Sequence, residues 1–350
     1  MSDVMRFGLI GAGAIGKIRA DALAASPVCT LAAISDLDEG RARAAAPSAN
    51  YFAEVQALIE SPEVDAVIIS TPPQFHEALA LAAAAAGKHA LVEKPMAATP
   101  DASLRMIAAA RQAKTLLTVG YNHRYFDALK LVRDTVASGD IGELTHVRAF
   151  TGHRGLEEFK AGWMYDKAVM GGGALMDNGT HLIDLVRYIM GDPEEVFGFA
   201  TSKVWKLGVE DEGIALMRTA SGVTASLEAS WHEWRGYRFH IEAYGDRGMA
   251  RAYYAPMLAT VVRMDKPGGA TSVARHFYPK AILREKLKGW QSTVIQTFVE
   301  ELADFVAAAR GQAHSGRLAV ASDGLRAVQI ANAVYDSEAR REYIRQPALP

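Results

Sequence analysis

The sequence is poor in cysteine: one residue, Cys29, stands among 350. A single cysteine excludes a disulfide within the chain and any zinc site built from several cysteines. A chain without disulfides suits a reducing compartment, so we expect a cytoplasmic protein. The chain also lacks a basic N-terminal segment followed by an apolar run, and we therefore expect no secretory leader.

Strong charge of either sign and long apolar runs are absent as well. The formal net charge is −2, which provides no basic field to hold nucleic acid or an anionic membrane surface. The alanine-rich segment 77–88 is too short and too weakly apolar to cross a bilayer. We expect neither a nucleic-acid partner nor a membrane partner.

The predicted pattern of strands and helices changes near residue 122. Residues 5–122 alternate short apolar strands with helical segments, which is the pattern of a parallel, doubly wound sheet. A helix and then successive strands with short turns follow, and these favour a largely antiparallel sheet. We therefore expect an α/β protein of two domains, residues 1–122 and 123–350, in keeping with the chain length.

A glycine motif, "GAGAIG", follows the first expected strand and begins the first expected helix. Gly11 permits the tight turn, Gly13 lets a pyrophosphate approach the backbone, and Gly16 lets helix and strand pack closely. The helix N-terminus adds unpaired N–H groups and partial positive charge. The predicted dinucleotide contacts in this motif are Gly11, Gly13, Ala14, Ile15 and Gly16.

Asp36 ends the second expected strand, 20 residues after Gly16. A carboxylate at this place accepts hydrogen bonds from the adenosine ribose and repels the extra phosphate of NADP. NAD is therefore the expected cofactor, and NADP is the less favoured one. Arg41 and Arg43 lie nearby and can relieve that repulsion, although solvated helix charges are the favoured interpretation of both.

Two further strand ends lie at the edge of the sheet where doubly wound folds bind ligands. "STPPQFH" follows the fourth strand, and "LVEKP" ends the fifth. The candidate cofactor contacts there are Ser70, Thr71, Pro72, His76, Glu93 and Lys94. Taken alone, Lys94 has two equally favoured interpretations, as a lysine that forms an ion pair with Glu93 or as a functional lysine.

The stretch "GGGALMDNGTHLID", residues 171–184, puts charged groups into what is otherwise a buried helix pattern. Asp177, His181 and Asp184 stand at i, i+4 and i+7, so a regular helix carries them on one stripe. Each also has a structural interpretation, as a helix-start carboxylate, a satisfied interior imidazole and an ion-pair partner. The complete motif favours function for Asp177 and His181 and leaves Asp184 undecided.

Taken together, the chain resembles the glucose-fructose oxidoreductase, inositol dehydrogenase and rhizopine-catabolism protein family (Gfo/Idh/MocA). The motifs that carry the resemblance are, in order, "GAGAIG", "TPPQFH", "EKP", "GYNHRY", "GGGALMDNGTHLID", "VEDEG" and "SDGLRAV". The resemblance implies a nicotinamide-dependent oxidoreductase of sugars, polyols or related carbohydrates. It also implies an N-terminal Rossmann domain, a C-terminal α+β domain whose open sheet forms pocket and subunit interface, a homodimer or homotetramer, and no metal.

The resemblance also assigns catalytic positions. Lys94 matches the lysine of the family's EKP motif, and Asp177 and His181 match the acid and the histidine of its GGxxxDxGxH motif. His181 is the expected base for a hydroxyl proton, because an imidazole titrates near neutral pH. Asp177 would orient it, and Lys94 would stabilise the developing alkoxide. The candidate substrate contacts are Asn122, His123, Arg124, His153, Arg154, Trp163, Tyr165 and Asn178.

The predicted reaction is hydride transfer between a secondary alcohol and the nicotinamide of NAD(P). Two other functions use the same residues. A glycoside-cleaving enzyme would oxidise its substrate transiently with bound NAD, eliminate the leaving group and reduce the product again. A non-catalytic cofactor-binding protein would need only the nucleotide site.

Overall fold

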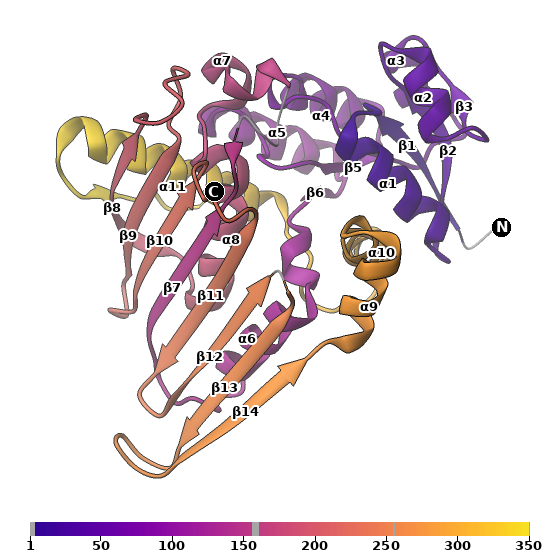
Figure 1. Cartoon of the computed structure of the whole chain (residues 1–350). Coiled ribbons are helices and arrows are strands. Elements are labelled where there is room, and N and C mark those ends of the chain that lie inside the picture. Colours follow the sequence, from indigo (N-terminus) through magenta and orange to yellow (C-terminus); the bar gives the residue numbers. More distant parts are fainter. Residues whose placement is uncertain (1–3, 156–160, 255, 350) are drawn as a thin grey trace. The chain divides into compact units, whose positions relative to one another are not determined.

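The computed structural model describes residues 4–155, 161–254 and 256–349, so the outer ends of the two predicted domains, residues 1 and 350, lie outside it. The chain forms two compact units, the first from residues 1–125 and 284–325 and the second from 126–283 and 326–350 (Figure 1). The sequence predicted a single boundary at 122; the structure in addition groups residues 284–325 with the N-terminal unit. The chain passes between the units within α9 (Pro279–Lys288) and α11 (Ala321–Arg340).

The first unit carries a six-stranded sheet in the order β3-β2-β1-β4-β5-β6, and its described strand pairs are all parallel. The strands are β1 (Met5–Ile10), β2 (Cys29–Ser35), β3 (Asn50–Tyr51), β4 (Ala66–Ile69), β5 (His89–Val92) and β6 (Leu117–Val119). The helices are α1 (Ala14–Ala25), α2 (Glu39–Ala45), α3 (Val55–Glu60), α4 (His76–Ala85), α5 (Pro100–Ala113) and α10 (Gln291–Ala309), with 3-10 turns η1 (Pro73–Phe75) and η2 (Asn122–Tyr125). The predicted doubly wound Rossmann arrangement is confirmed.

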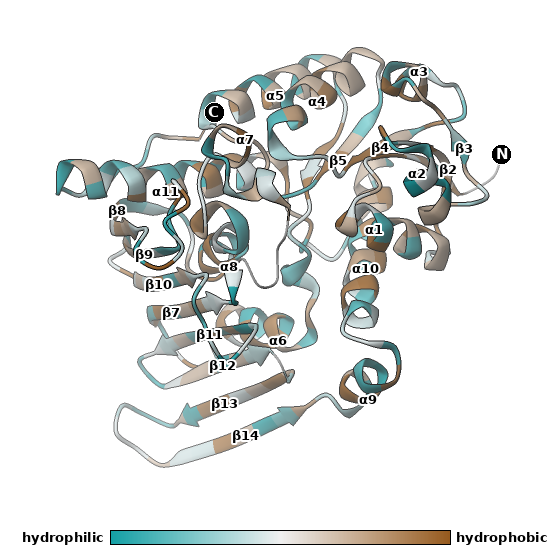
Figure 2. Ribbon diagram, turned by 45° about the horizontal axis from the view of Figure 1, so that its top comes forward, coloured by the Kyte–Doolittle hydropathy of each residue, from teal (hydrophilic) through white to brown (hydrophobic). Residues whose placement is uncertain are grey.

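Helix α10 returns to the first unit because its apolar face completes the core there. Phe298, Leu302 and Phe305 are buried in one cluster with residues of β1, β2 and α1, and the rings of Phe7 and Phe305 lie 5.4 Å apart. Figure 2 shows hydrophobic residues along both α10 and the strand β4. Full burial of each such side chain contributes about 1.5–3 kcal/mol, which explains why so distant a segment belongs to this unit.

The second unit carries a nine-stranded sheet in the order β14-β13-β12-β11-β7-β10-β9-β8-β15. The strands are β7 (Leu144–Gly152), β8 (Pro193–Thr201), β9 (Glu212–Thr219), β10 (Thr224–Ser230), β11 (Arg238–Gly245), β12 (Gly248–Tyr254), β13 (Leu258–Met264), β14 (Thr271–Phe277) and β15 (Ile344–Arg345). Within the described strands, β7 and β10 form the one parallel pair and the others are antiparallel. The predicted largely antiparallel sheet is confirmed.

One face of this sheet packs against helices. Figure 1 shows α6 (Asp127–Ala137) and α8 (Thr180–Met190) along it, with α8 against β7 and α6 against β11, β12 and β13. Strand β9 shows the resulting alternation, because Ala215, Met217 and Thr219 are buried while Leu216 is exposed. A 3-10 turn η4 (Gly162–Tyr165), the short helix α7 (Lys167–Met170) and a π-helical turn η5 (Leu175–Gly179) precede α8.

No helix of the described residues has both the length and the apolar character that crossing a membrane requires.

Candidate active site

The three glycines of the β1–α1 loop meet three different steric demands. Gly11 has φ +94°, and a Cβ there would lie 2.7 Å from the Ser70 carbonyl oxygen. A Cβ on Gly16 would collide with the Gly11 carbonyl, so helix and loop touch at this point. A Cβ on Gly13 would meet no atom within 4 Å, and Gly13 to Ile15 are exposed. The open second glycine at a helix N-terminus therefore leaves room for a pyrophosphate.

Asp36, one residue past β2, is joined to this loop. Its Oδ2 accepts the N–H of Ala12 at 2.6 Å, and its Oδ1 accepts Arg41 Nη2 at 2.5 Å and the N–H of Asp38 at 2.9 Å. Burial raises the pKa of Asp36, but these hydrogen bonds outweigh it and hold the pKa below its usual range. Asp36 is therefore a carboxylate at neutral pH, and Arg41 is its ion-pair partner rather than a freely solvated helix charge.

His76 connects the two other strand-end loops of the first unit. Its Nε2 lies 2.8 Å from the Thr71 carbonyl oxygen, and its Nδ1 lies 3.1 Å from that of Pro95. The imidazole is completely buried, and burial lowers its pKa. His76 thus fixes the loop after β4, which holds Ser70, Thr71 and Pro72, against the loop after β5. Its direct contact with a cofactor stays a prediction.

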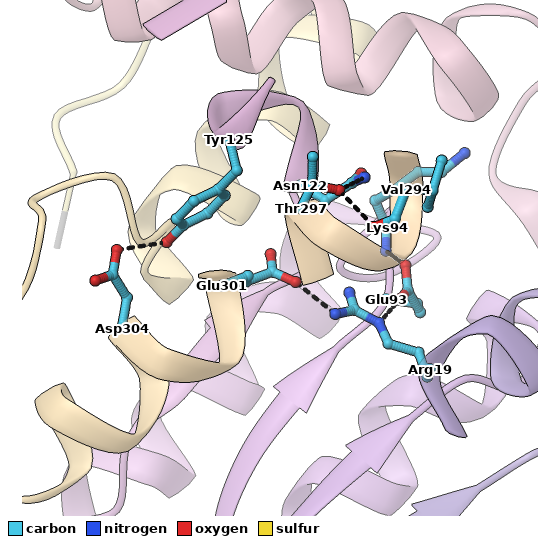
Figure 3. A network of polar contacts seen from close by, with 9 residues as sticks. All are labelled: Arg19, Glu93, Lys94, Asn122, Tyr125, Val294, Thr297, Glu301 and Asp304. Carbon is cyan, nitrogen blue, oxygen red and sulfur yellow. Dashed lines mark hydrogen bonds and ion pairs between the residues drawn. The ribbon is translucent and has the colours of Figure 1, made fainter. Parts of the chain in front are cut away.

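Lys94 follows β5 and is half-buried, next to the buried Glu93 (Figure 3). Burial, together with the nearby charge of Lys94, lowers the pKa of His123 to about 3. His123 is therefore neutral at physiological pH and suited to hydrogen bonding, not to taking a proton near pH 7. The two neighbours of His123 were also predicted to contact substrate, and both bind partners within the first unit. Asn122 Nδ2 donates to Thr297 Oγ1 at 2.9 Å, and Arg124 forms an ion pair with Asp323 at 3.3 Å.

In the second unit, Asp177 lies in the π-helical turn η5, where the sequence predicted a regular helix. Nδ1 of His153 accepts the N–H of Gly155 at 2.9 Å, so Nε2 carries the proton and donates to Asp177 Oδ2 at 3.4 Å. Asp177 and His153 are both buried. The predicted substrate residue His153 therefore donates a hydrogen bond to the predicted catalytic acid, Asp177.

His181 lies in the first turn of α8 and is 6% exposed, while Asp184 is completely buried one turn further on. The hydroxyl of Thr180 donates to the Asp177 carbonyl at 3.0 Å and thereby links the π turn to the helix. Arg187 forms an ion pair with Asp192 at 2.6 Å, and its pairing with Asp184 stays a prediction. Both side chains are buried, and His181 keeps slightly more exposed surface than Asp184.

An aromatic group surrounds the His153–Asp177 pair. The ring of Trp231 lies 6.2 Å from that of His153 and stands edge-on to Tyr165 at 5.4 Å. Burial and the charge of Asp177 raise the pKa of Tyr165, so its hydroxyl stays protonated as a donor. The other predicted substrate residues of this unit lie nearer the surface: Trp163 is 40% exposed, Asn178 is half-buried, and Arg154 Nε donates to the Trp234 carbonyl at 3.2 Å.

Glu210 and Tyr335 explain two of the three consecutive glycines before Asp177. Its Oε2 accepts the N–H of Gly173 at 2.8 Å, and its Oε1 accepts the N–H of Leu175 at 3.0 Å and the Tyr335 hydroxyl at 2.8 Å. A Cβ on Gly172 would collide with the Tyr335 hydroxyl, and one on Gly173 with the Glu210 carbonyl. Glu210 lies in the motif "VEDEG", but the sequence predicted no role for it. Tyr335 lies in no motif identified from the sequence.

A metal centre finds no support in residues 4–155, 161–254 and 256–349, where no group of three or more His, Cys, Asp or Glu side chains is arranged to hold an ion. The glycine loop and Asp36 do fit a dinucleotide, by the open space at Gly13 and the ionised carboxylate. Gly11 to Gly16 and Asp36 would hold NAD in this unit.

Comparison with known families matches both parts of the chain. The model of an oxidoreductase family with an NAD-binding Rossmann fold covers residues 5–121, and that of the GFO/IDH/MocA C-terminal domain covers residues 129–251. The N-terminal unit is thus an NAD-binding Rossmann domain, as the glycine motif predicted.

Individual relatives extend the similarity over most of the chain. Myo-inositol 2-dehydrogenase of Thermotoga maritima is 32% identical over 282 residues, which span 78% of this chain and 82% of that protein. Rhizopine catabolism protein MocA of Rhizobium meliloti is 28% identical over 94% of this chain and 93% of its own length. The solved structure of levoglucosan dehydrogenase in complex with NADH and L-sorbose matches with a TM-score of 0.87 at 25% identity, over 99% of this chain and 100% of that one.

Proposed function

The chain belongs to the Gfo/Idh/MocA family of oxidoreductases, and on that premise we propose that it transfers a hydride between a secondary alcohol of a sugar or polyol and NAD. The substrate class is supported by the relatives, which are named for inositol, levoglucosan and 1,5-anhydro-D-fructose. The exposed Trp163 and the Tyr165–Trp231 pair suit the apolar face of a sugar ring.

The observation that carries this proposal is the buried His153–Asp177 pair, directly before the turn that carries His181. A charged carboxylate is expensive to bury, and here His153 donates a hydrogen bond to it one turn before His181. Such an arrangement suits an imidazole that must become charged during turnover.

The chemistry divides among the residues of the chain as follows. NAD, when bound, supplies the hydride acceptor. His181 takes the hydroxyl proton, and the fixed negative charge of Asp177 stabilises the imidazolium that results. Lys94, carried by the first unit, stabilises the negative charge that develops on the substrate oxygen. The neutral His123 near Lys94 adds a hydrogen-bonding group without competing for the proton.

Asp36 supports a preference for NAD over NADP. Its carboxylate is ionised and would repel a ribose phosphate, and its Oδ1 already accepts Arg41. Arg41 is half-exposed and neutralises part of this charge, so we propose a graded preference in which NADP binds more weakly.

The outer face of the nine-stranded sheet supports a homodimer or homotetramer. Strand alternation places Phe199, Leu216 and Val273 away from α6 and α8, and they are 40%, 45% and 54% exposed. A second copy would bury this surface. A cytoplasmic location is part of the same proposal, supported by the lone buried thiol of Cys29.

The test is a panel of sugars and polyols, incubated with NAD or NADP and followed by the absorbance of the reduced cofactor. Stoichiometric NADH formation is expected with at least one member. Cleavage of a glycoside without net NADH would support the transient-oxidation enzyme instead. Tight NADH binding with no turnover across the panel would support the non-catalytic binder.

A further inference from the structure

A buried arginine on α1 joins the strand end that carries Lys94 to helix α10. Arg19 has no exposed surface; its Nε lies 2.6 Å from Glu93 Oε1, and its Nη1 lies 2.5 Å from Glu301 Oε2. Its guanidinium also stacks over the ring of Phe298, 3.6 Å from the ring centre. Figure 3 shows the arginine between the two carboxylates, with Glu93 next to Lys94.

The chain leaves space for this charged group at Gly120. A Cβ there would stand 2.6 Å from Arg19 Nη2 and 3.0 Å from Glu93 Oε2. Buried ion pairs are a weak source of stability, because removing the charges from water offsets most of their attraction. An apolar contact between α1 and α10 would stabilise the unit comparably. Stability alone therefore does not account for an Arg–Glu–Glu group at this position.

The Arg19–Glu93–Glu301 group contacts the backbone of Lys94. Glu93 Oε2 accepts the N–H of Lys94 at 3.3 Å, while Glu93 Oε1 is held by Arg19. On the other side of Lys94, the Pro95 carbonyl faces His76 Nδ1. The backbone of Lys94 is thus held from both sides, and one of these contacts depends on the ion pairs with α10.

We propose that Glu301 is a positioning residue, which acts through Arg19 and Glu93 to fix the backbone from which Lys94 reaches the substrate oxygen. This role rests on the function proposed above for Lys94. Glu301 touches neither cofactor nor substrate in this scheme. It affects the chemical step because electrostatic stabilisation falls steeply when a charge is displaced by about 1 Å.

The charge state of Glu301 couples this group to pH. Burial raises the pKa of Glu301 to about 7, although the charges of Arg19 and Arg124 oppose the rise and that of Glu93 adds to it. Tyr125 also faces Glu301, from η2. Below about pH 7 Glu301 is neutral, and its ionic hydrogen bond to Arg19 weakens. Lys94 should therefore be positioned best above neutral pH.

The test compares Glu301→Gln with Asp304→Asn. Asp304 is a matched control, because it is a buried carboxylate one turn further along α10 that accepts the Tyr125 hydroxyl at 2.8 Å and has no link to Glu93. On an active sugar, Glu301→Gln should lower kcat by about tenfold or more with the Kd for NADH changed less than about twofold. Asp304→Asn should leave kcat within about twofold. Glu301→Asp, which keeps the charge, should recover part of the loss.

Two further measurements separate positioning from simple loss of structure. In the wild type, the acid limb of log kcat against pH should reflect two protonations, of His181 and Glu301, and Glu301→Gln should reduce it to one. In the protein without cofactor, the acetylation rate of Lys94, read by peptide mass spectrometry, should change by about threefold or more in Glu301→Gln and stay constant in Asp304→Asn.

The outcomes are distinguishable. Equal losses of kcat in Glu301→Gln and Asp304→Asn would overturn the positioning role. An unchanged acetylation rate of Lys94 in Glu301→Gln would overturn it as well. A rise in KM or in the Kd for NADH at constant kcat would overturn it as well. If no sugar or polyol reduces NAD, the proposed function fails, whereas the acetylation rates still decide whether Glu301 controls Lys94.

Discussion

The two loops that present the candidate catalytic side chains are both built around a buried carboxylate, yet opposite kinds of partner hold them. At the loop after β5, Glu93 binds the guanidinium of Arg19. At the loop before Asp177, Glu210 accepts two backbone N–H groups and the hydroxyl of Tyr335. One loop is held by an ion pair and the other by neutral donors.

The difference shows what each kind of partner does for a buried charge. Neutral donors fix the direction of the Glu210 carboxylate but do not cancel its charge, and burial raises its pKa in spite of them. Arg19 cancels one charge, and the cost of burial then falls on the second carboxylate, Glu301. A loop held by ions should be sensitive to pH near neutrality, and a loop held by neutral donors should depend on each hydrogen bond.

Removing the side chain that each loop presents should have the largest effect. Lys94→Ala removes the charge that stabilises the substrate oxygen, and His181→Ala removes the base; each should lower kcat by about 100-fold or more. The Kd for NADH should change by less than about threefold, because both groups act on bound substrate. Steady-state rates and NADH fluorescence titration measure the two quantities. Lys130→Ala, at a lysine of α6 that pairs with Asp127, is the control and should behave as wild type.

Normal turnover in either variant would remove that residue from the reaction. A large loss of kcat in His181→Ala but not in Lys94→Ala would mean that the loop after β5 has only a structural role.

Neutralising the carboxylate at the second loop should have the next largest effect. Asp177→Asn keeps the shape but removes the charge that supports a protonated imidazole, so kcat should fall about tenfold to 100-fold. Loss of an opposite charge disfavours the imidazolium, so the acid limb of the pH–rate profile should move to lower pH. Asp184→Asn, on the next turn of α8, is the control. An unmoved limb in Asp177→Asn, or the same shift in both variants, would contradict the assigned role of Asp177.

Asp36 provides a third carboxylate, whose side chain is 6% exposed and which is held by the half-exposed Arg41. Asp36→Ser removes an acceptor for the ribose and a like charge that repels NADP. The Kd for NAD should rise about tenfold, the scale of one hydrogen bond to a charged group, while binding of NADP should tighten. Calorimetric titration with both cofactors measures this. Asp38→Ser, which removes a neighbouring negative charge but keeps a capping hydroxyl at the start of α2, is the control. Unchanged affinities for both cofactors would exclude Asp36 from the site.

Local patterns were sufficient to predict the architecture and the chemistry-bearing motifs. Alternating strands and helices predicted the parallel sheet, and short-turned strands predicted the antiparallel one. The glycine spacing predicted a dinucleotide fold, which the family comparison confirms. Each of these signals lies within a few residues of the feature that it predicts.

The partners of the buried charges could not be predicted in the same way. Arg19 and Glu301 are 282 residues apart, and periodicity tells which face of a helix is buried but not what covers it. For the same reason, the return of α10 to the first unit and the parallel β7–β10 pair were not predicted. The π-helical turn at Asp177 is invisible to a helical pattern that assumes 3.6 residues per turn.

The smallest expected effect is the loss of one neutral donor at the second loop. Tyr335→Phe removes a hydroxyl that donates to Glu210 and should lower the unfolding free energy by about 1–3 kcal/mol at pH 8. Since the folded-state pKa of Glu210 is raised, the carboxylate takes up a proton on acidification more readily in the folded chain than in the unfolded one. The hydroxyl favours the ionised form, so the loss should shrink as the pH falls and Glu210 becomes protonated. Urea unfolding of wild type and Tyr335→Phe at pH 8 and pH 5 measures it. Tyr343→Phe, at a tyrosine that is 62% exposed, should cost little at either pH. A loss of equal size at both pH values would mean that Tyr335 contributes packing alone and that the second loop is not held through its hydroxyl.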